Sequence, residues 1–195
     1  GTCKVAGGYD YVVPDSDPID EYGHGTNVAG IVASSDSTNT GIAPDARLVA
    51  LRACPGGATC DEDDVADSLL WCYNNRNTYN ISVVTMSLGF DNGDGQCGTN
   101  WANPEIDLLY NAGITLIASS GNNDDEDEIH YPACNDKVIA VGATYDFGNG
   151  SQEVDWCKEV NGGTLLFGAR WLGELGILPF SCADYPAVDN IACFT

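Results

Sequence analysis

The chain has 195 residues, 44% of them hydrophobic and 9% aromatic, so it can bury one sizeable core and is not expected to be disordered. Its 29 acidic and 7 basic residues give a formal net charge of −22, which argues against a nucleic-acid partner because phosphate binding needs clustered Lys and Arg. No apolar run approaches the roughly 20 residues that span a bilayer, so we expect no membrane association.

The first half of the chain alternates between helical and strand-like patterns. Residues 24–34 predict a helix with an apolar face formed by Val28, Ile31 and Val32. Residues 47–53 predict a short, mostly buried strand. The acids at 61–64 favour the start of a helix, because the helix dipole stabilises negative charge there. One face of that helix is formed by Val65, Leu69, Cys72 and Tyr73.

The second half continues the alternation. Three runs predict strands, at 81–86, 114–118 and 138–141. A helix near 103–112 has Pro104 in its first turn and Gly113 placed to end it. Strands separated by helices of about 10–15 residues predict βαβ units. We therefore expect an α/β fold, a three-layer sandwich around a mainly parallel sheet.

The cysteines indicate the compartment. Nine occur, an odd number, so at least one has no partner within this chain. Zinc is disfavoured because there is no Cys-x-x-Cys pair and the chain has two histidines. Disulfides fit better and predict a secreted, extracellular protein. The pairs that we expect are Cys54 with Cys60, Cys97 with Cys134, and two of Cys157, Cys182 and Cys193.

Residues 23–32 read Gly-His-Gly-Thr-Asn-Val-Ala-Gly-Ile-Val. The small residues let a helix lie close to a strand, and the imidazole of His24 then stands at the exposed start of the helix. Ligands of open α/β folds bind at this edge of the sheet. A histidine with an ordinary pKa of about 6.5 can accept and return a proton near neutral pH. Composition alone also fits a structural histidine.

The string resembles the histidine motif of the subtilase family, usually His-Gly-Thr-His-Val-Ala-Gly, with Asn27 in place of the second histidine. That second position is not the catalytic one. The resemblance implies a subtilisin-like fold and an endopeptidase in which His24 acts as general base and then general acid. It also implies polypeptide substrates, and we expect a monomer.

Three further segments resemble the family in the same order, at 85–89, 117–122 and 131–143. The first implies a cradle that holds the substrate main chain as an added strand, formed by Ser87, Leu88 and Gly89. The second implies that Asn122 donates a hydrogen bond to the oxyanion of the tetrahedral intermediate. It also implies a wall of the primary specificity pocket, which we assign to Ser119, Ser120 and Gly121.

Two members of the expected triad are missing. The family order is Asp, His, Ser, and neither an Asp-Ser/Thr-Gly nor a Gly-Thr-Ser-x-Ala motif occurs. We interpret residues 1–195 as a partial peptidase domain, incomplete at both ends and inactive alone, with a Cys- and Gly-rich insertion at 145–188. Within that insertion 164–167 predicts a short strand, and the last residues, 188–195, resemble another strand of the family. The alternative is a non-catalytic, peptide-binding relative.

The loop before His24 concentrates carboxylates. Calcium takes six to eight oxygen ligands on a bendable loop. The spacing resembles a calcium loop of some subtilases, with Val13 where an acid is expected. The resemblance matches Asp10, Asp15 and Asp17, and together with Asp20 these are the expected ligands of a structural Ca²⁺. A solvated turn is the alternative.

Overall fold

The computed structural model describes residues 4–56, 59–91, 97, 101–122 and 129–142, and the backbone of 190–194. In chain order the elements are β1 (Val5–Asp10), α1 (His24–Ala33), β2 (Leu48–Arg52), α2 (Glu62–Tyr79), β3 (Val83–Met86), α3 (Asn103–Asn111), β4 (Thr115–Ser119), β5 (Ile139–Val141) and β6 (Asn190–Phe194). The predicted insertion at 145–188 and its strand at 164–167 lie outside the described residues.

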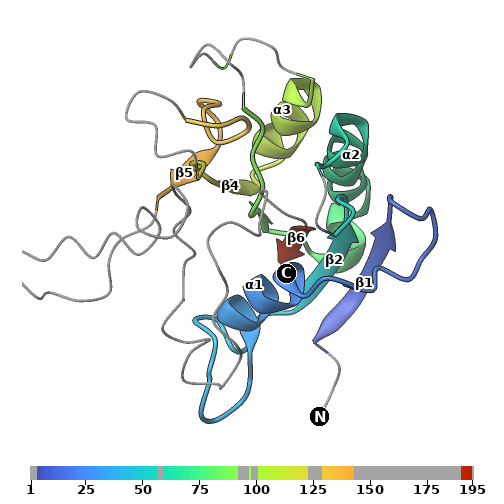
Figure 1. Cartoon of the computed structure of the whole chain (residues 1–195), viewed down its shortest axis with the longest axis vertical. Helices are drawn as coiled ribbons and strands as arrows, with labels where there is room; N and C mark the ends of the chain where they lie inside the picture. The colour runs from blue at the N-terminus through green and yellow to red at the C-terminus, as the bar shows by residue number, and fades with distance from the viewer. Residues whose placement is uncertain are drawn as a thin grey trace, which may run out of the picture.

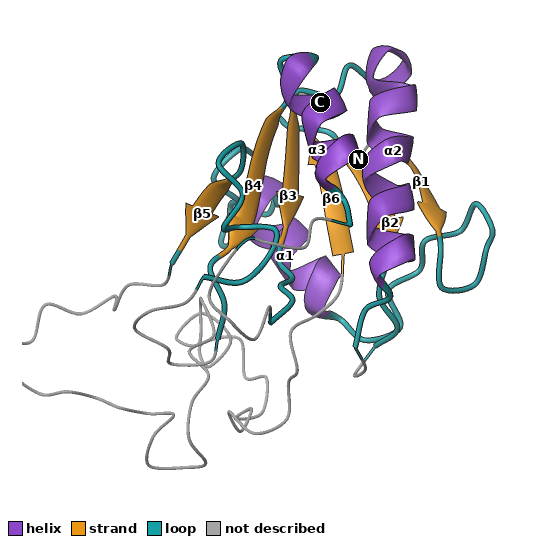
Figure 2. Ribbon diagram, turned by 90° about the horizontal axis from the view of Figure 1, so that it is seen from above, coloured by secondary structure: helices purple, strands orange, loops and turns teal. Residues whose placement is uncertain are grey.

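A six-stranded sheet in the order β1-β2-β6-β3-β4-β5 forms the middle layer. β1 pairs parallel with β2, and β4 pairs parallel with both β3 and β5. β6 is antiparallel to β2 and to β3, so the other strands all run in one direction. Helices α2 and α3 cover one face and α1 covers the other (Figures 1 and 2). This arrangement confirms the predicted three-layer α/β fold with a mainly parallel sheet.

Two strands go beyond what the sequence predicts. β6 is a strand as expected, but it lies antiparallel in the centre of the sheet, where Cys193 pairs with Val49 on one side and Val84 on the other. β1 has no counterpart among the predicted elements, because Gly7 and Gly8 lower its strand propensity. The two glycines are needed for close packing. A Cβ atom on Gly7 would lie 2.6 Å from the Tyr79 hydroxyl oxygen, and one on Gly8 would collide with the backbone of Ala50.

The main core lies between the sheet and the α2–α3 layer. The predicted face of α2 is buried at Val65, Leu69 and Cys72, with Tyr73 packed at its edge. On the other face of the sheet a smaller cluster is formed by Ala33 and Leu48 with Ala29, Val32, Ala46 and Val83. The sequence places Ile31 on the apolar face of α1, but Ile31 is 37% exposed. The residues of α1 that pack against the sheet are Ala29, Val32 and Ala33.

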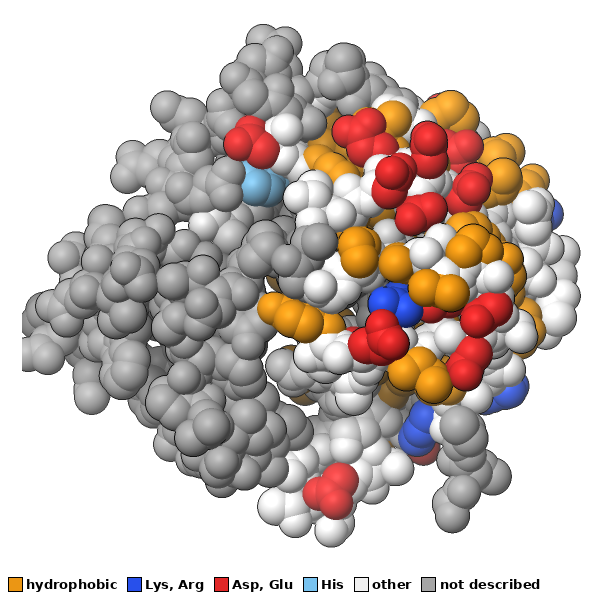
Figure 3. Space-filling view, turned by 45° about the vertical axis from the view of Figure 1, so that its right-hand side comes forward, with side chains coloured by type: hydrophobic (Ala, Val, Ile, Leu, Met, Phe, Trp, Pro, Cys, Tyr) orange, Lys and Arg blue, Asp and Glu red, His pale blue; other side chains and the backbone are white. Residues whose placement is uncertain are grey.

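The helix boundaries follow the expected local chemistry. Asp61 caps α2 by accepting a hydrogen bond from the backbone N–H of Asp63 at 2.9 Å, as the acids at 61–64 predict. α3 has a proline in its first turn, and it ends before Gly113, which has a φ of 79°. Burial, together with repulsion from neighbouring aspartates, raises the pKa of Asp64. Acidic side chains gather on the face shown in Figure 3, with few basic ones between them.

Two of the expected disulfides are present. Cys54 is bonded to Cys60 with a Cα–Cα distance of 4.4 Å, which closes the short loop after β2. Cys97 is bonded to Cys134 with a Cα–Cα distance of 5.5 Å, and ties together segments 37 residues apart. Cys72 also takes part in a disulfide. The third expected pairing, between two of Cys157, Cys182 and Cys193, stays a prediction, because Cys157, Cys182 and the side chain of Cys193 lie outside the described residues.

Candidate active site

His24 is the first residue of α1 and lies toward the carboxyl edge of the sheet. α1 connects the parallel strands β1 and β2, so it runs back along the sheet, antiparallel to them. Its last residue, Ala33, belongs to the cluster that contains Leu48 and Val83, the first residues of β2 and β3. The ten-residue helix is about 15 Å long. The imidazole of His24 therefore lies toward the edge where ligands of such sheets bind.

The imidazole of His24 is partly buried, and its Nδ1 is a buried nitrogen without a hydrogen-bond partner among the described residues. Burial lowers the pKa of His24 below its ordinary value, and the nearby carboxylate of Asp20 opposes that shift in part. The lowered pKa favours the neutral ring. A neutral imidazole can accept a proton from a hydroxyl group, which is what a general base requires.

Asp20 supplies the cap that the start of α1 lacks. The N-cap residue is Gly23, which has no side chain to bind the free N–H groups of the first turn. The carboxylate of Asp20 accepts hydrogen bonds from the backbone N–H of Tyr22, Gly23 and Thr26 at 2.7–2.9 Å and from the Thr26 hydroxyl at 2.8 Å. Burial by itself raises the pKa of Asp20, but these hydrogen bonds outweigh it and lower the pKa.

The predicted substrate cradle follows β3 directly. The last paired residue of β3 is Met86, and Ser87, Leu88 and Gly89 continue beyond it at the carboxyl edge. The Leu88 side chain is fully buried in the core, whereas Ser87 and Gly89 are partly exposed. Leu88 therefore anchors the segment, and the residues on either side of it remain accessible.

The predicted pocket wall follows β4, the next strand. The Ser119 hydroxyl donates a hydrogen bond to the carbonyl oxygen of Leu88 at 3.1 Å, so the cradle and the wall are joined directly. Gly121 has a φ of 124°, a conformation that favours glycine, and the exposed Asn122 follows it. The structure thus brings the cradle and the wall together, and β-sheet geometry places His24 at the same edge.

The sequence does not single out His130, which lies against both segments. Its backbone N–H donates to the carbonyl oxygen of Ser120 at 2.9 Å. Its imidazole packs against Gly89 and Gly121, and the residue is 8% exposed. The signal that could have identified it is its position directly before the family-like segment that begins at Tyr131.

The acids predicted to bind calcium have other partners here. Asp10 is buried and pairs with the guanidinium of Arg52 at 2.8 Å, while Asp20 caps α1. Asp15 accepts a hydrogen bond from the backbone N–H of Asp17 at 2.7 Å. Within the described ranges, no group of three or more His, Cys, Asp and Glu side chains is arranged to hold a metal ion. The four carboxylates do not fit a common calcium site in this arrangement, and calcium binding stays a prediction.

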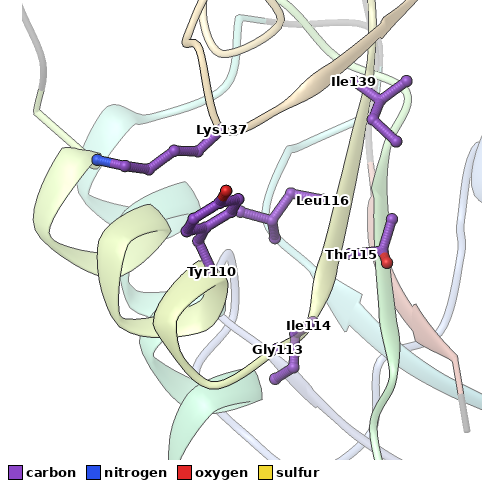
Figure 4. Close-up of a pocket in the computed structure, with 7 residues that line it drawn as sticks. All are labelled: Tyr110, Gly113, Ile114, Thr115, Leu116, Lys137 and Ile139. Atoms are coloured by element: carbon purple, nitrogen blue, oxygen red, sulfur yellow. The ribbon is translucent and has the colours of Figure 1, made fainter.

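A shallow pocket of about 460 Å³ lies elsewhere, between the end of α3 and the amino ends of β4 and β5 (Figure 4). Its lining residues are Tyr110, Gly113, Ile114, Thr115, Leu116, Lys137 and Ile139. Lys137 extends toward α3, where its ammonium group pairs with Asp107 at 2.7 Å. The pocket contains no predicted site residue, and it lies at the opposite edge of the sheet from the cradle.

The comparison with protein families decides the identity. The model of the subtilase family matches residues 2–173, most of the chain. The chain belongs to the subtilase family. The motif-based resemblance at 23–32 is thereby confirmed at the level of the family.

Curated relatives of this subtilase are serine proteases. It is 36% identical over 143 residues to a thermophilic serine proteinase of Bacillus sp. (strain AK1), with 72% of this chain and 33% of the relative covered. It is 34% identical over 145 residues to subtilisin DY of Bacillus licheniformis, with 72% and 50% covered. The chain thus spans a third to a half of the length of these relatives.

Solved structures agree on the fold. Sphericase superimposes with a TM-score of 0.62 at 25% identity, covering 74% of this subtilase and 47% of that chain. The S41 psychrophilic protease gives a TM-score of 0.62 at 28% identity, with 73% and 48% covered. Over the part of the subtilase that the structure describes, no helix is both long and apolar enough to cross a bilayer.

Proposed function

We propose that this subtilase chain is part of a secreted serine endopeptidase that hydrolyses polypeptides through an Asp-His-Ser triad, of which only His24 lies in these 195 residues. The observation that carries the proposal is the state of His24. It stands at the start of α1 toward the carboxyl edge of the sheet, with a lowered pKa and a buried Nδ1 that lacks a partner among the described residues.

The unpartnered Nδ1 is the atom that an orienting carboxylate would bind. With Nδ1–H donating to that carboxylate, Nε2 of His24 is left with its lone pair free to take the proton of an attacking serine hydroxyl. The imidazolium that forms is stabilised by the same carboxylate, and it then returns the proton to the leaving amine. Burial favours the neutral ring before the reaction, so the base is ready at neutral pH.

The segments after β3 and β4 supply the remaining parts. Ser87 and Gly89 are accessible beside a buried anchor, as a backbone cradle for an extended peptide requires. Asn122 is exposed after Gly121 and can direct its amide N–H groups toward a developing oxyanion. The Ser119–Leu88 hydrogen bond holds both segments in one unit.

Secretion is supported by the covalent structure. The disulfides Cys54–Cys60 and Cys97–Cys134 are expected to form and persist in an oxidising compartment, outside the cytosol. Mass spectrometry of the natural protein without reduction checks this expectation, because free thiols at these four cysteines would contradict it.

A covalent probe for activated serines tests the catalytic proposal. The chain alone and a longer product of the same reading frame, with its flanking sequences, are treated with a fluorophosphonate probe and assayed with a peptide mixture. We expect labelling and peptide hydrolysis by the longer protein only, both abolished by His24→Gln. Labelling of the chain alone would contradict the proposal. A folded longer protein that binds peptides without being labelled would favour the non-catalytic, peptide-binding alternative.

A further inference from the structure

Cys72 of α2 is a buried cysteine that takes part in a disulfide. Its side chain is fully buried in the main core, between α2 and the sheet, and its sulfur is bonded to another cysteine. Two pairs of cysteines are bonded within themselves and cannot supply that partner, namely Cys54–Cys60 and Cys97–Cys134. The cysteines that remain as partners are Cys3, Cys157, Cys182 and Cys193.

The register of β6 decides on which face of the sheet Cys193 lies. Residues that are paired on neighbouring strands share a face, because the two faces alternate along each strand. Cys193 is paired with Val49 of β2 and with Val84 of β3. Both valines are fully buried, and they belong to the same core cluster as Cys72. The register therefore places Cys193 on the face that α2 covers.

The neighbouring position of β6 belongs to the opposite face, as the alternation requires. Phe194 is paired with Leu48 and Val83, which belong to the smaller cluster on the α1 side of the sheet. A shift of one residue would exchange the two faces. The pairing of β6 with β2 and with β3 runs without such a shift, so both neighbours give the same face for Cys193.

α2 brings Cys72 to the same depth of the sheet. The helix connects the parallel strands β2 and β3, so it runs back toward their amino ends. Cys72 lies in the second half of α2, and Val49 and Val84 are the second residues of their strands. Ser68, one turn before Cys72, is small and fully buried, which allows close packing. Cα atoms of α2 lie within 8 Å of Cα atoms of β6.

We propose that Cys72 and Cys193 form a disulfide that fastens β6 to α2. Each thiol loses its proton as the S–S bond forms, and the two electrons pass to a disulfide oxidant of an oxidising compartment, which is reduced to two thiols. A disulfide joins Cα atoms about 4.4–6.8 Å apart, which the close packing of α2 on β6 brings within reach. The bond closes a loop of more than half the chain, so it restricts the unfolded state and stabilises the fold.

The proposal also fixes the pairing that the sequence leaves open. With Cys193 bonded to Cys72, the pairing expected among Cys157, Cys182 and Cys193 becomes Cys157 with Cys182. The nine cysteines then form four bonds, and Cys3 is the one left without a partner within these 195 residues.

Disulfide mapping of the natural protein tests the proposal and needs no catalytic activity. Free thiols are blocked with N-ethylmaleimide, the unreduced protein is digested, and linked peptides are identified by mass spectrometry before and after reduction. We expect a pair that joins the Cys72 peptide to the Cys193 peptide and separates on reduction. The Cys97–Cys134 pair in the same digest is the matched control. A link from Cys72 to any other cysteine, or a blocked thiol at Cys193, overturns the proposal and leaves the proposed function untouched.

A double-mutant cycle gives a second measurement. Cys72→Ala, Cys193→Ala and the double variant all remove the same bond. We expect each single variant to lower the melting temperature by about 10 °C, the effect of losing one long-range disulfide, and the double variant to melt close to the single ones. Losses that add in the double variant would contradict a bond between the two residues. Where a variant does not fold, the mapping of the natural protein decides alone.

Discussion

The two histidines of this subtilase present the same unpaired atom in different surroundings. His24 and His130 each have a buried Nδ1 without a partner among the described residues. His24 stands at the start of a helix, next to the carboxylate of Asp20, which opposes the lowering of its pKa by burial. His130 lies outside any helix or strand, and its ring packs against Gly89 and Gly121.

The difference between the two sites shows how context assigns a role to one side chain. At His24, the helix start and the nearby charge are compatible with the proposed proton transfer, and an orienting acid is the partner proposed for Nδ1. At His130, the ring packs against two glycines of the expected cradle and pocket wall, and its surroundings are set by packing. The expected role of His24 follows from a motif, whereas the position of His130 follows from packing.

The largest effect is expected at His24. In the longer protein His24→Gln should lower kcat/KM by at least roughly 10²–10⁴-fold, because general acid–base catalysis is lost. Steady-state hydrolysis of a chromogenic peptide measures this effect. The control is Asn27→Ala, on the same helix, which should keep activity within a fewfold. An equal loss in both variants would mean that the helix, and not the imidazole, had been disturbed.

A smaller loss is expected at Asn122, directly after the expected pocket wall. Asn122→Ala should lower kcat by roughly 10²–10³-fold with little change in KM, the size found for this oxyanion donor in subtilisin. Asn111→Ala, at the exposed end of α3, is the matched control and should have no effect on either constant. A change confined to KM would contradict the assignment of Asn122 to the transition state.

The acidic loop before His24 provides the third test. If calcium binds there, it should stabilise the folded state by about 2.7 kcal/mol at a hundredfold excess over Kd. The melting temperature should therefore rise. The double variant Asp15→Ala/Asp17→Ala should lose that rise, whereas Asp36→Ala, in the loop after α1, should keep it. Differential scanning calorimetry with calcium and with EDTA measures both. An identical melting temperature in calcium and in EDTA would favour the solvated turn, in which Asp10 forms an ion pair with Arg52 and binds no calcium.

The smallest effect is expected from Asp20→Asn. Removing the charge should lower the pKa of His24 further, because the carboxylate raises it now, and NMR titration of the His24 ring measures the shift. Asp20 caps α1, which contributes about 1 kcal/mol to the stability of the folded protein. The pKa of Asp20 is lowered in the folded protein. This contribution is therefore present above the ordinary Asp pKa and is lost as pH falls through the lower, folded value.

Asp36→Asn is the control for that titration. Asp36 accepts backbone hydrogen bonds from Thr38 and Asn39 at 2.8 and 2.9 Å, which resembles the chemistry of Asp20, but it lies in the loop after the far end of α1. The pKa of His24 should therefore stay the same in this variant. A shift of equal size in both variants would show that Asp20 acts through net charge and not through its position.

Local patterns were sufficient for most elements and for the motif. Periodicity, acidic helix starts and β-branched runs act between neighbouring residues, and they predict the start of α2 and the approximate ranges of α1, α3, β2, β3, β4 and β5. The expected role of His24 follows from a contiguous string, as do the expected roles of Ser87 and Asn122. The Cys54–Cys60 bridge also spans a short loop that sequence spacing can suggest.

The tertiary structure decided the features that depend on distant residues. The sequence alone determined the family, the layered α/β plan and the histidine motif, because these are written in short contiguous segments. The sequence did not reveal that Arg52 forms an ion pair with Asp10 or that β6 lies in the sheet between β2 and β3. It also did not reveal that His130 packs against Gly89 and Gly121. Each of these contacts joins segments far apart in the chain or uses glycines whose space is filled by another element, so only the folded backbone specifies them.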